Sequence, residues 1–166
     1  MPYLVKALLG AGADPMATEP SKRRTCLHSA AENGDFDVLS TVLFSSNVKL
    51  NIDSLDAEGN AVSHLIAANT NPNGQQQRSL MLLLDKGASI SCTTAKKASL
   101  LHLVCCNQSL SQRQIAEPLT QMLIEMNADV NTVDIENCSP LILAAAMNEW
   151  GLCRVLLEGG ADMNIP

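Results

Sequence analysis

The sequence predicts an all-α fold, a solenoid of stacked helix–turn–helix units. Two apolar phrases alternate along its 166 residues and return at nearly constant intervals, which is the signature of a repeat architecture. Hydrophobic residues make up 46 % of the chain but aromatic residues only 2 %. This balance favours closely packed helices over strands, in which β-branched and aromatic residues dominate.

The first phrase is an apolar run followed by a small loop and a polar residue. It occurs at Leu8–Asp14, Leu83–Ser89, Leu123–Asp129 and Leu156–Asp162. The apolar run predicts the last turns of a helix. Gly87 and Gly160 follow two of these runs, at the place where a helix end requires a left-handed residue.

The second phrase predicts a short helix with small apolar residues. It occurs at Thr25–Ala31, Ala61–Ala67, Ser99–Cys105 and Ser139–Ala145. Three of the four copies begin with a hydroxyl residue, which can cap the free N–H groups of a helix start. The intervals are 36 residues from His28 to His64, 38 from His64 to His102, and 40 from His102 to Ile142.

Together the two phrases resemble the ankyrin-repeat family, whose pattern is T-P-L-H-x-A-A, a second helix, and an LL-x-x-GAD-x-N ending. The resemblance covers nearly the whole chain. It implies a single ankyrin-repeat domain over 1–166, with a partial repeat at 1–19 and repeats at about 20–55, 56–93, 94–133 and 134–166. Apolar residues at both ends lead us to expect a fragment of a longer array, because solenoids normally carry polar caps.

Two repeats depart from the family spacing. They are longer by five and seven residues, and the extra segments, 69–78 and 107–116, fall between the two helices of a repeat. The first has loop chemistry, whereas the second either forms a loop or lengthens a helix. Ala61 stands where a hydroxyl cap is usual. We therefore expect the middle repeats to be the less stable ones.

Charge and composition narrow the classes of partner. A formal net charge of -6 disfavours nucleic acid as a partner, because its phosphate backbone is also negative. There is no run of about 18 apolar residues, so we expect no membrane insertion. None of the six cysteines forms a C-x-x-C pair, which is typical of free thiols in a reducing compartment. We expect a cytoplasmic monomer.

Candidate sites for chemistry are few. The three histidines fall one per repeat, about 10 Å apart along a stack, so they predict a structural role and no metal site. Cys105 falls on a small core position and Cys106 on the position after it, facing the concave surface. The sequence holds no nucleophile elbow, phosphate loop or zinc-protease motif. We therefore expect no enzyme activity and no cofactor.

The family resemblance implies that the chain binds another protein or a peptide segment. The binding surface would be concave, made of β-turn finger tips and the ends of the first helices. By repeat register it comprises Lys22, Arg24, Glu32, Asn33, Glu58, Asn60, Ala68, Asn69, Lys96, Ala98, Cys106, Asn107, Glu136, Cys138, Ala146 and Met147. The tips alternate in charge from basic to acidic. The alternative is a structural spacer or targeting arm of a larger scaffold, channel or enzyme.

Overall fold

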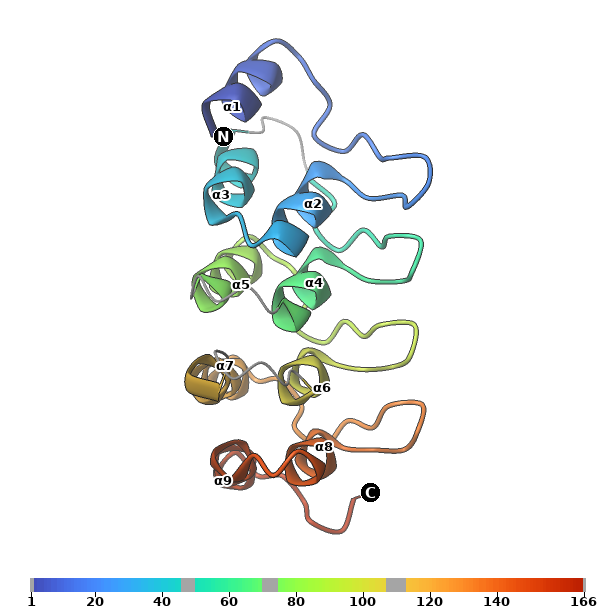
Figure 1. Cartoon of the computed structure of the whole chain (residues 1–166), viewed down its shortest axis with the longest axis vertical. Coiled ribbons are helices and arrows are strands. Elements are labelled where there is room, and N and C mark those ends of the chain that lie inside the picture. Colours follow the sequence, from blue (N-terminus) through green and yellow to red (C-terminus); the bar gives the residue numbers. More distant parts are fainter. Residues whose placement is uncertain (1, 46–49, 70–74, 107–112, 166) are drawn as a thin grey trace. The chain divides into compact units, whose positions relative to one another are not determined.

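The computed structural model describes residues 2–45, 50–69, 75–106 and 113–165. Every regular element in these residues is a helix (Figure 1), which confirms the all-α prediction. The helices are α1 (Pro2–Gly10), α2 (Cys26–Asn33), α3 (Phe36–Ser45), α4 (Val62–Ala68), α5 (Gln76–Asp85), α6 (Leu100–Cys105), α7 (Arg113–Glu125), α8 (Pro140–Ala146) and α9 (Trp150–Glu158).

The chain divides into two compact units. Unit 1 is Met1–Ser89 and unit 2 is Ile90–Pro166. The single domain over 1–166 stays a prediction.

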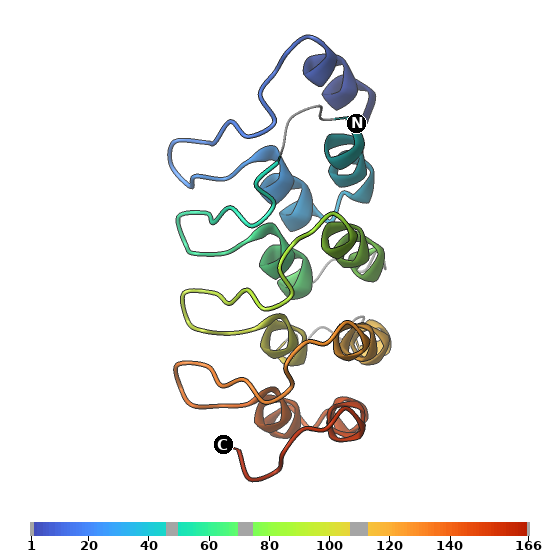
Figure 2. The ribbon, with the colours of Figure 1, turned by 180° about the vertical axis from the view of Figure 1, so that it is seen from behind.

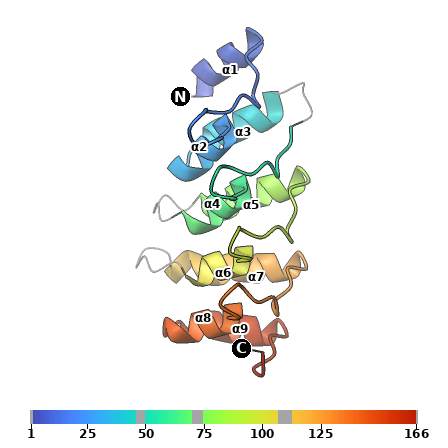
Figure 3. The same cartoon turned by 90° about the vertical axis from the view of Figure 1, so that its right-hand side faces the viewer.

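Unit 1 has two layers of helices. The short helices α2 and α4 pack side by side in one layer, and α1, α3 and α5 pack in the other (Figures 1 and 3). The core lies between the layers, where Leu27, Leu39 and Leu80 are at most 1 % exposed. Helix α1 packs on α3, as expected of a chain that opens with the second helix of a repeat.

Unit 2 repeats the arrangement with two helix pairs. Helices α6 and α8 lie side by side, and α7 packs on α9 in a second layer beside them (Figure 2). Leu101, Leu119 and Leu156 are at most 2 % exposed and fill the space between the layers. In both units a helix buries its apolar face only by stacking on its neighbours, which is the principle of a solenoid.

The first helix of each pair begins at the residue that the sequence indicates. The N-caps are Thr25, Ala61, Ser99 and Ser139. The Ser139 hydroxyl accepts the Ile142 N–H at 3.4 Å, the expected capping bond. At the Ala61 cap, which lacks a hydroxyl, the His64 Nδ1 accepts the Ala61 N–H at 2.9 Å. This bond is the half of a capping box that the third helical residue supplies; the other half, which needs a side-chain acceptor on the N-cap residue, is missing at Ala61.

Three of the second helices, α5, α7 and α9, are followed by a left-handed residue. Gly87 has φ 94° and Gly160 has φ 91°, which confirms the prediction for both glycines. The corresponding residue after α7 is Asn127, with φ 65°. Asparagine is the residue that tolerates this conformation best after glycine.

The two insertions fall between the first and second helix of a repeat, as predicted, but their last residues belong to the second helices: 76–78, predicted as loop, to α5, and 113–116 to α7. Their central residues, 70–74 and 107–112, fall outside the described residues. Helix α7 has 13 residues, against 10 in α5 and 9 in α9. It begins at Arg113, ahead of Pro118, so the described part of the second insertion lengthens the helix.

Two cation–π contacts join α3 to α5 in the outer layer of unit 1. The Arg78 guanidinium lies 4.8 Å from the centre of the Phe36 ring. The Lys86 ammonium lies 4.1 Å from the centre of the Phe44 ring. The partners are eight residues apart on each helix, about two turns, so the contacts hold both ends of α3 against α5.

Candidate functional site

Each helix pair is preceded by a hairpin turn, here called a finger. The fingers comprise residues 19–24 and 56–60 in unit 1, and 94–98 and 134–138 in unit 2. Each is closed by a backbone hydrogen bond from its first residue to the carbonyl of its last, with N···O distances of 2.9, 2.9, 3.0 and 3.1 Å in chain order. The residue before the last is left-handed in all four: Arg23, Gly59, Lys97 and Asn137.

Neighbouring fingers are joined at their tips within each unit. In unit 1 the Ala57 N–H donates to the Lys22 carbonyl at 2.8 Å, and in unit 2 the Ile135 N–H donates to the Lys96 carbonyl at 3.0 Å. These bonds hold the backbone of the tips, while the side chains of Lys22 and Lys96 remain exposed. The tips therefore present side chains from a fixed backbone.

In the second finger of each unit, the side chain of the first residue, an aspartate, accepts hydrogen bonds from backbone N–H groups of the same finger. The Asp56 Oδ1 accepts the N–H groups of Glu58 and Asn60, both at 2.9 Å. In unit 2, Asp134 makes the equivalent bonds at 2.8 and 3.0 Å. Sequence reasoning missed both aspartates. The available signal was an aspartate three residues before a left-handed glycine or asparagine, which is turn chemistry.

Buried histidines tie the first helices to the fingers. The Nδ1 of His28 accepts the Thr25 N–H at 3.2 Å, and the Nδ1 of His102 accepts the Ser99 N–H at 3.1 Å. Because Nδ1 accepts, the neutral ring carries its proton on Nε2. That group donates from His102 to the Cys138 carbonyl at 2.9 Å. The structural role predicted for these two histidines is confirmed.

The surroundings of His28 favour its neutral form. Its Nε2 lies 3.0 Å from the Ser54 carbonyl and 3.3 Å from the Asn60 carbonyl. Burial lowers the pKa of His28, and the hydrogen bond to the Asn60 carbonyl offsets only part of that effect. The ring therefore links α2 to the finger 56–60 without carrying a charge at neutral pH.

Arg24, one of the predicted contact residues, is buried. It is 8 % exposed. Its Nε lies 3.1 Å from the Asp56 Oδ2, and its Nη1 lies 2.7 Å from the Glu32 Oε2. The Glu32 side chain is 53 % exposed. The guanidinium is therefore occupied inside unit 1, whereas Glu32 faces solvent as predicted.

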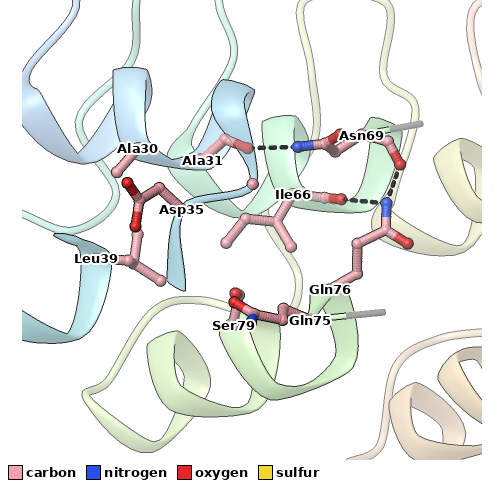
Figure 4. A pocket seen from close by; sticks show the side chains of 10 residues that line it. Ala30, Ala31, Asp35, Leu39, Ile66, Asn69, Gln75, Gln76 and Ser79 are labelled. Carbon is pink, nitrogen blue, oxygen red and sulfur yellow. Dashed lines mark hydrogen bonds between the residues drawn. The ribbon is translucent and has the colours of Figure 1, made fainter. Parts of the chain in front are cut away.

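The Asn69 side chain is also engaged in hydrogen bonds inside unit 1. Its amide nitrogen donates to the Ala31 carbonyl at 2.7 Å (Figure 4) and to the Glu32 carbonyl at 3.1 Å. The Gln76 amide donates in turn to the Ile66 and Asn69 carbonyls. These amides bond to carbonyls at the ends of α2 and α4, where the Ala31 and Ile66 carbonyls also accept the N–H of the C-cap residue. The hollow between them measures about 10 Å³, room for about one water molecule.

The other predicted contact residues differ in exposure. In unit 1, Asn33, Glu58 and Ala68 are exposed and Asn60 is half-buried; in unit 2, Cys106, Glu136 and Ala146 are exposed, and Ala98, Cys138 and Met147 are half-buried. Asn107 lies outside the described residues. Cys105 is 1 % exposed, as its core position predicts. Fingers and first-helix ends thus provide an exposed polar set in unit 1 and a more apolar set in unit 2.

The described residues hold neither a metal cluster nor a membrane-spanning helix. Within them, no three histidine, cysteine or acidic side chains are placed to hold a metal ion. None of the helices seen in 2–45, 50–69, 75–106 and 113–165 is long and apolar enough to cross a membrane.

Paired helices, closed fingers and histidines that cap helices define a repeat module, and comparison with known proteins identifies its family. The family model for ankyrin repeats (3 copies) matches residues 64–166, so the chain belongs to the ankyrin-repeat family. Members of this family are typically non-enzymatic modules of protein–protein interaction.

Relatives of known name carry the same repeats. B-cell lymphoma 3 protein homolog of Mus musculus is 30 % identical over 167 residues, covering 99 % of this chain and 34 % of that protein. NF-kappa-B inhibitor delta of Mus musculus is 30 % identical over 185 residues, covering 97 % of this chain and 54 % of that protein. The chain thus spans between a third and about half of these relatives.

A solved structure agrees with the fold. It is described as the ankyrin repeat domain of Bcl-3, a unique member of the IkappaB protein family. The TM-score is 0.82 at 28 % identity, covering 99 % of this chain and 68 % of the solved chain.

Proposed function

We propose that the chain binds a partner protein through one finger-bearing surface in each unit. Surface 1 comprises Lys22, Glu32, Asn33, Glu58 and Ala68, and surface 2 comprises Lys96, Cys106, Glu136, Ala146 and Met147. The observation that carries the proposal is the hydrogen bond between neighbouring finger tips in each unit. It fixes the spacing of the exposed side chains before any partner arrives, which reduces the entropy lost on binding.

Both surfaces carry charged finger tips, and surface 2 also carries apolar side chains. Each has one basic and one acidic tip, Lys22 with Glu58 and Lys96 with Glu136. Such charges speed encounter and select register more than they raise affinity. The apolar side chains of surface 2, Cys106 and Met147 among them, supply the kind of contact that dominates binding energy when a partner covers it.

The names of the relatives suggest a first partner to test. Mouse NF-kappa-B inhibitor delta is named for its action on NF-kappa-B, and Bcl-3 is described as a member of the IkappaB family. We therefore propose NF-kappa-B as the first candidate. Partners of one ankyrin protein do not follow from the fold alone, so this choice rests on sequence similarity.

Two matched double variants test the surfaces. Lys22→Ala/Lys96→Ala removes one tip cation from each unit, and Lys6→Ala/Arg154→Ala removes one exposed cation per unit from outer-layer helices. We expect the tip variant to slow association with the partner about tenfold, with an unchanged melting temperature. The control should stay within about twofold. Equal binding by both variants would count against these surfaces and favour a spacer or targeting arm.

The compartment is a further part of the proposal. All six cysteines are free thiols, which suits a reducing compartment. We propose a cytoplasmic location and a monomeric state. Cell fractionation and light scattering test them, and recovery in an oxidising compartment would contradict the first.

A further inference from the structure

Arg24 carries a positive charge at a position where the three other fingers have uncharged residues. It is the last residue of the finger 19–24 and directly precedes the N-cap of α2. The last residues of the other fingers are Asn60, Ala98 and Cys138, and none of them is a cation. This finger therefore contains a feature that the repeat pattern does not require.

The partners of Arg24 come from two other elements. One is Asp56, the first residue of the next finger, whose side chain is 1 % exposed. The other is Glu32, near the end of α2. A single guanidinium thus connects two fingers and a helix end, and its planar fork of donors suits two carboxylates at once.

Asp56 depends on the positive charge of Arg24 because its carboxylate is buried. One carboxylate oxygen accepts two backbone N–H groups of its finger, and the other accepts from the Arg24 Nε. Burial acts to raise the pKa of Asp56, but the Asn60 N–H and the guanidinium bring that pKa below its usual value. The carboxylate therefore stays ionised while buried, and an ionised buried group without a countercharge is strongly destabilising.

Unit 2 provides an internal comparison. Asp134 builds its finger with the same two backbone bonds, but it is half-buried. The residue in register with Arg24 is Ala98. A finger aspartate that reaches solvent does not depend on an arginine, because water stabilises its charge.

We propose that Arg24 is a positioning residue: it neutralises Asp56 and locks the finger 56–60 to the finger 19–24 and to the end of α2. The lock holds the tip bond between Ala57 and Lys22 in place, and with it the spacing of Lys22, Glu32 and Glu58 on surface 1. Its importance for recognition rests on the proposed function, whereas the lock itself does not.

Amide hydrogen exchange of the full chain measures the lock directly. In Arg24→Gln, the amides of Ala57, Glu58 and Asn60 should exchange at least about tenfold faster, because the finger opens locally. The matched amides of unit 2, Ile135, Glu136 and Cys138, should not change. Arg23→Gln is the control, since it removes the same charge from the exposed neighbour. Unchanged exchange in Arg24→Gln, or equal acceleration in Arg23→Gln, would overturn the proposal.

A double variant separates charge compensation from packing. In Arg24→Gln/Asp56→Asn, the asparagine oxygen can still accept both backbone N–H groups, and no unpaired charge remains. Protection should return at Glu58 and Asn60, but not at Ala57, because the link between the fingers is gone. This recovery is expected even if Arg24→Gln alone loses protection throughout α2 and α4. Failure to recover would show that Arg24 acts only by filling space.

The partner assay distinguishes the two proposals. If Arg24→Gln loosens the finger without weakening a partner that binds the wild-type chain, the lock stands and surface 1 fails. If exchange is unchanged, the lock fails whatever the partner does.

Discussion

Replacing His28 tests how α2 is capped and how it is joined to the segment that carries the finger 56–60. The ring is 0 % exposed. It accepts the Thr25 N–H through Nδ1 and donates through Nε2 to the Ser54 carbonyl at 3.0 Å. His28→Leu removes both bonds but keeps an apolar side chain of similar size. A backbone donor and a carbonyl then lose their partner in a buried place.

The expected loss follows from these two groups. Each buried backbone group left without a partner destabilises by about 1–3 kcal/mol, so His28→Leu should lower the free energy of unfolding by about 2–6 kcal/mol. Small domains have about 5–15 kcal/mol in total. His28→Gln should lose only about 1–3 kcal/mol, because glutamine at this position accepts the N-cap N–H, as in an ordinary capping box, but does not reach the Ser54 carbonyl.

Urea denaturation of the three proteins measures this difference, and pH adds an independent check. Burial lowers the pKa of His28 in the folded chain, whereas an unfolded histidine titrates near 6.5. The stabilisation by His28 is therefore complete above about pH 6.5 and is lost as the pH falls below it. The gap in stability between wild type and His28→Gln should shrink over that range. Equal stability of the wild type and the leucine variant, or a gap independent of pH, would refute the reasoning.

Three further variants or labels probe other parts of the chain. Gly160→Ala should lower the free energy of unfolding by about 1–2 kcal/mol, because an L side chain at φ 91° is strained. Asn127→Gly should be tolerated. Thermal melting compares the two variants. Lys86→Ala removes a cation–π contact and should lower the unfolding free energy by about 0.5–1 kcal/mol, and an unchanged urea midpoint would contradict that contact. Iodoacetamide should label exposed Cys106 in the native chain, more slowly than a free thiol, since burial raises its pKa. Cys105, whose pKa burial also raises, should be labelled only after unfolding, as mass spectrometry can show.

The fold could be predicted from the sequence because its signals are local and repeated. Thr25 and Ser139 mark helix starts, and Gly160 marks a helix end, through the chemistry of a few neighbouring residues. Four copies of the same order leave little room for another arrangement. The capping of α4 was harder to predict, because Ala61 offers no side-chain acceptor and the bond that remains at this cap comes from His64, three residues further on.

The candidate site was predictable only in outline. Register places Lys22, Glu32 and Arg24 on the same surface, but it does not show which of them is buried. The burial of Arg24 depends on Asp56, which is 32 residues away in the chain and belongs to the next repeat. Asn69 likewise bonds to carbonyls 37 and 38 residues earlier. Hydrogen bonds between repeats decide which side chains remain available to a partner. The pattern of a single repeat carries no information on these bonds.

Site-specific photo-crosslinking tests the central claim, that the fingers are the recognition surface. A photoreactive side chain is placed at Lys22 or Lys96 on the finger tips, and at Lys6 or Arg154 on outer-layer helices, all of them exposed. The account predicts that both tip positions crosslink to the same partner and that the outer positions do not. Crosslinks to that partner from Lys6 or Arg154, with none from the tips, would contradict it.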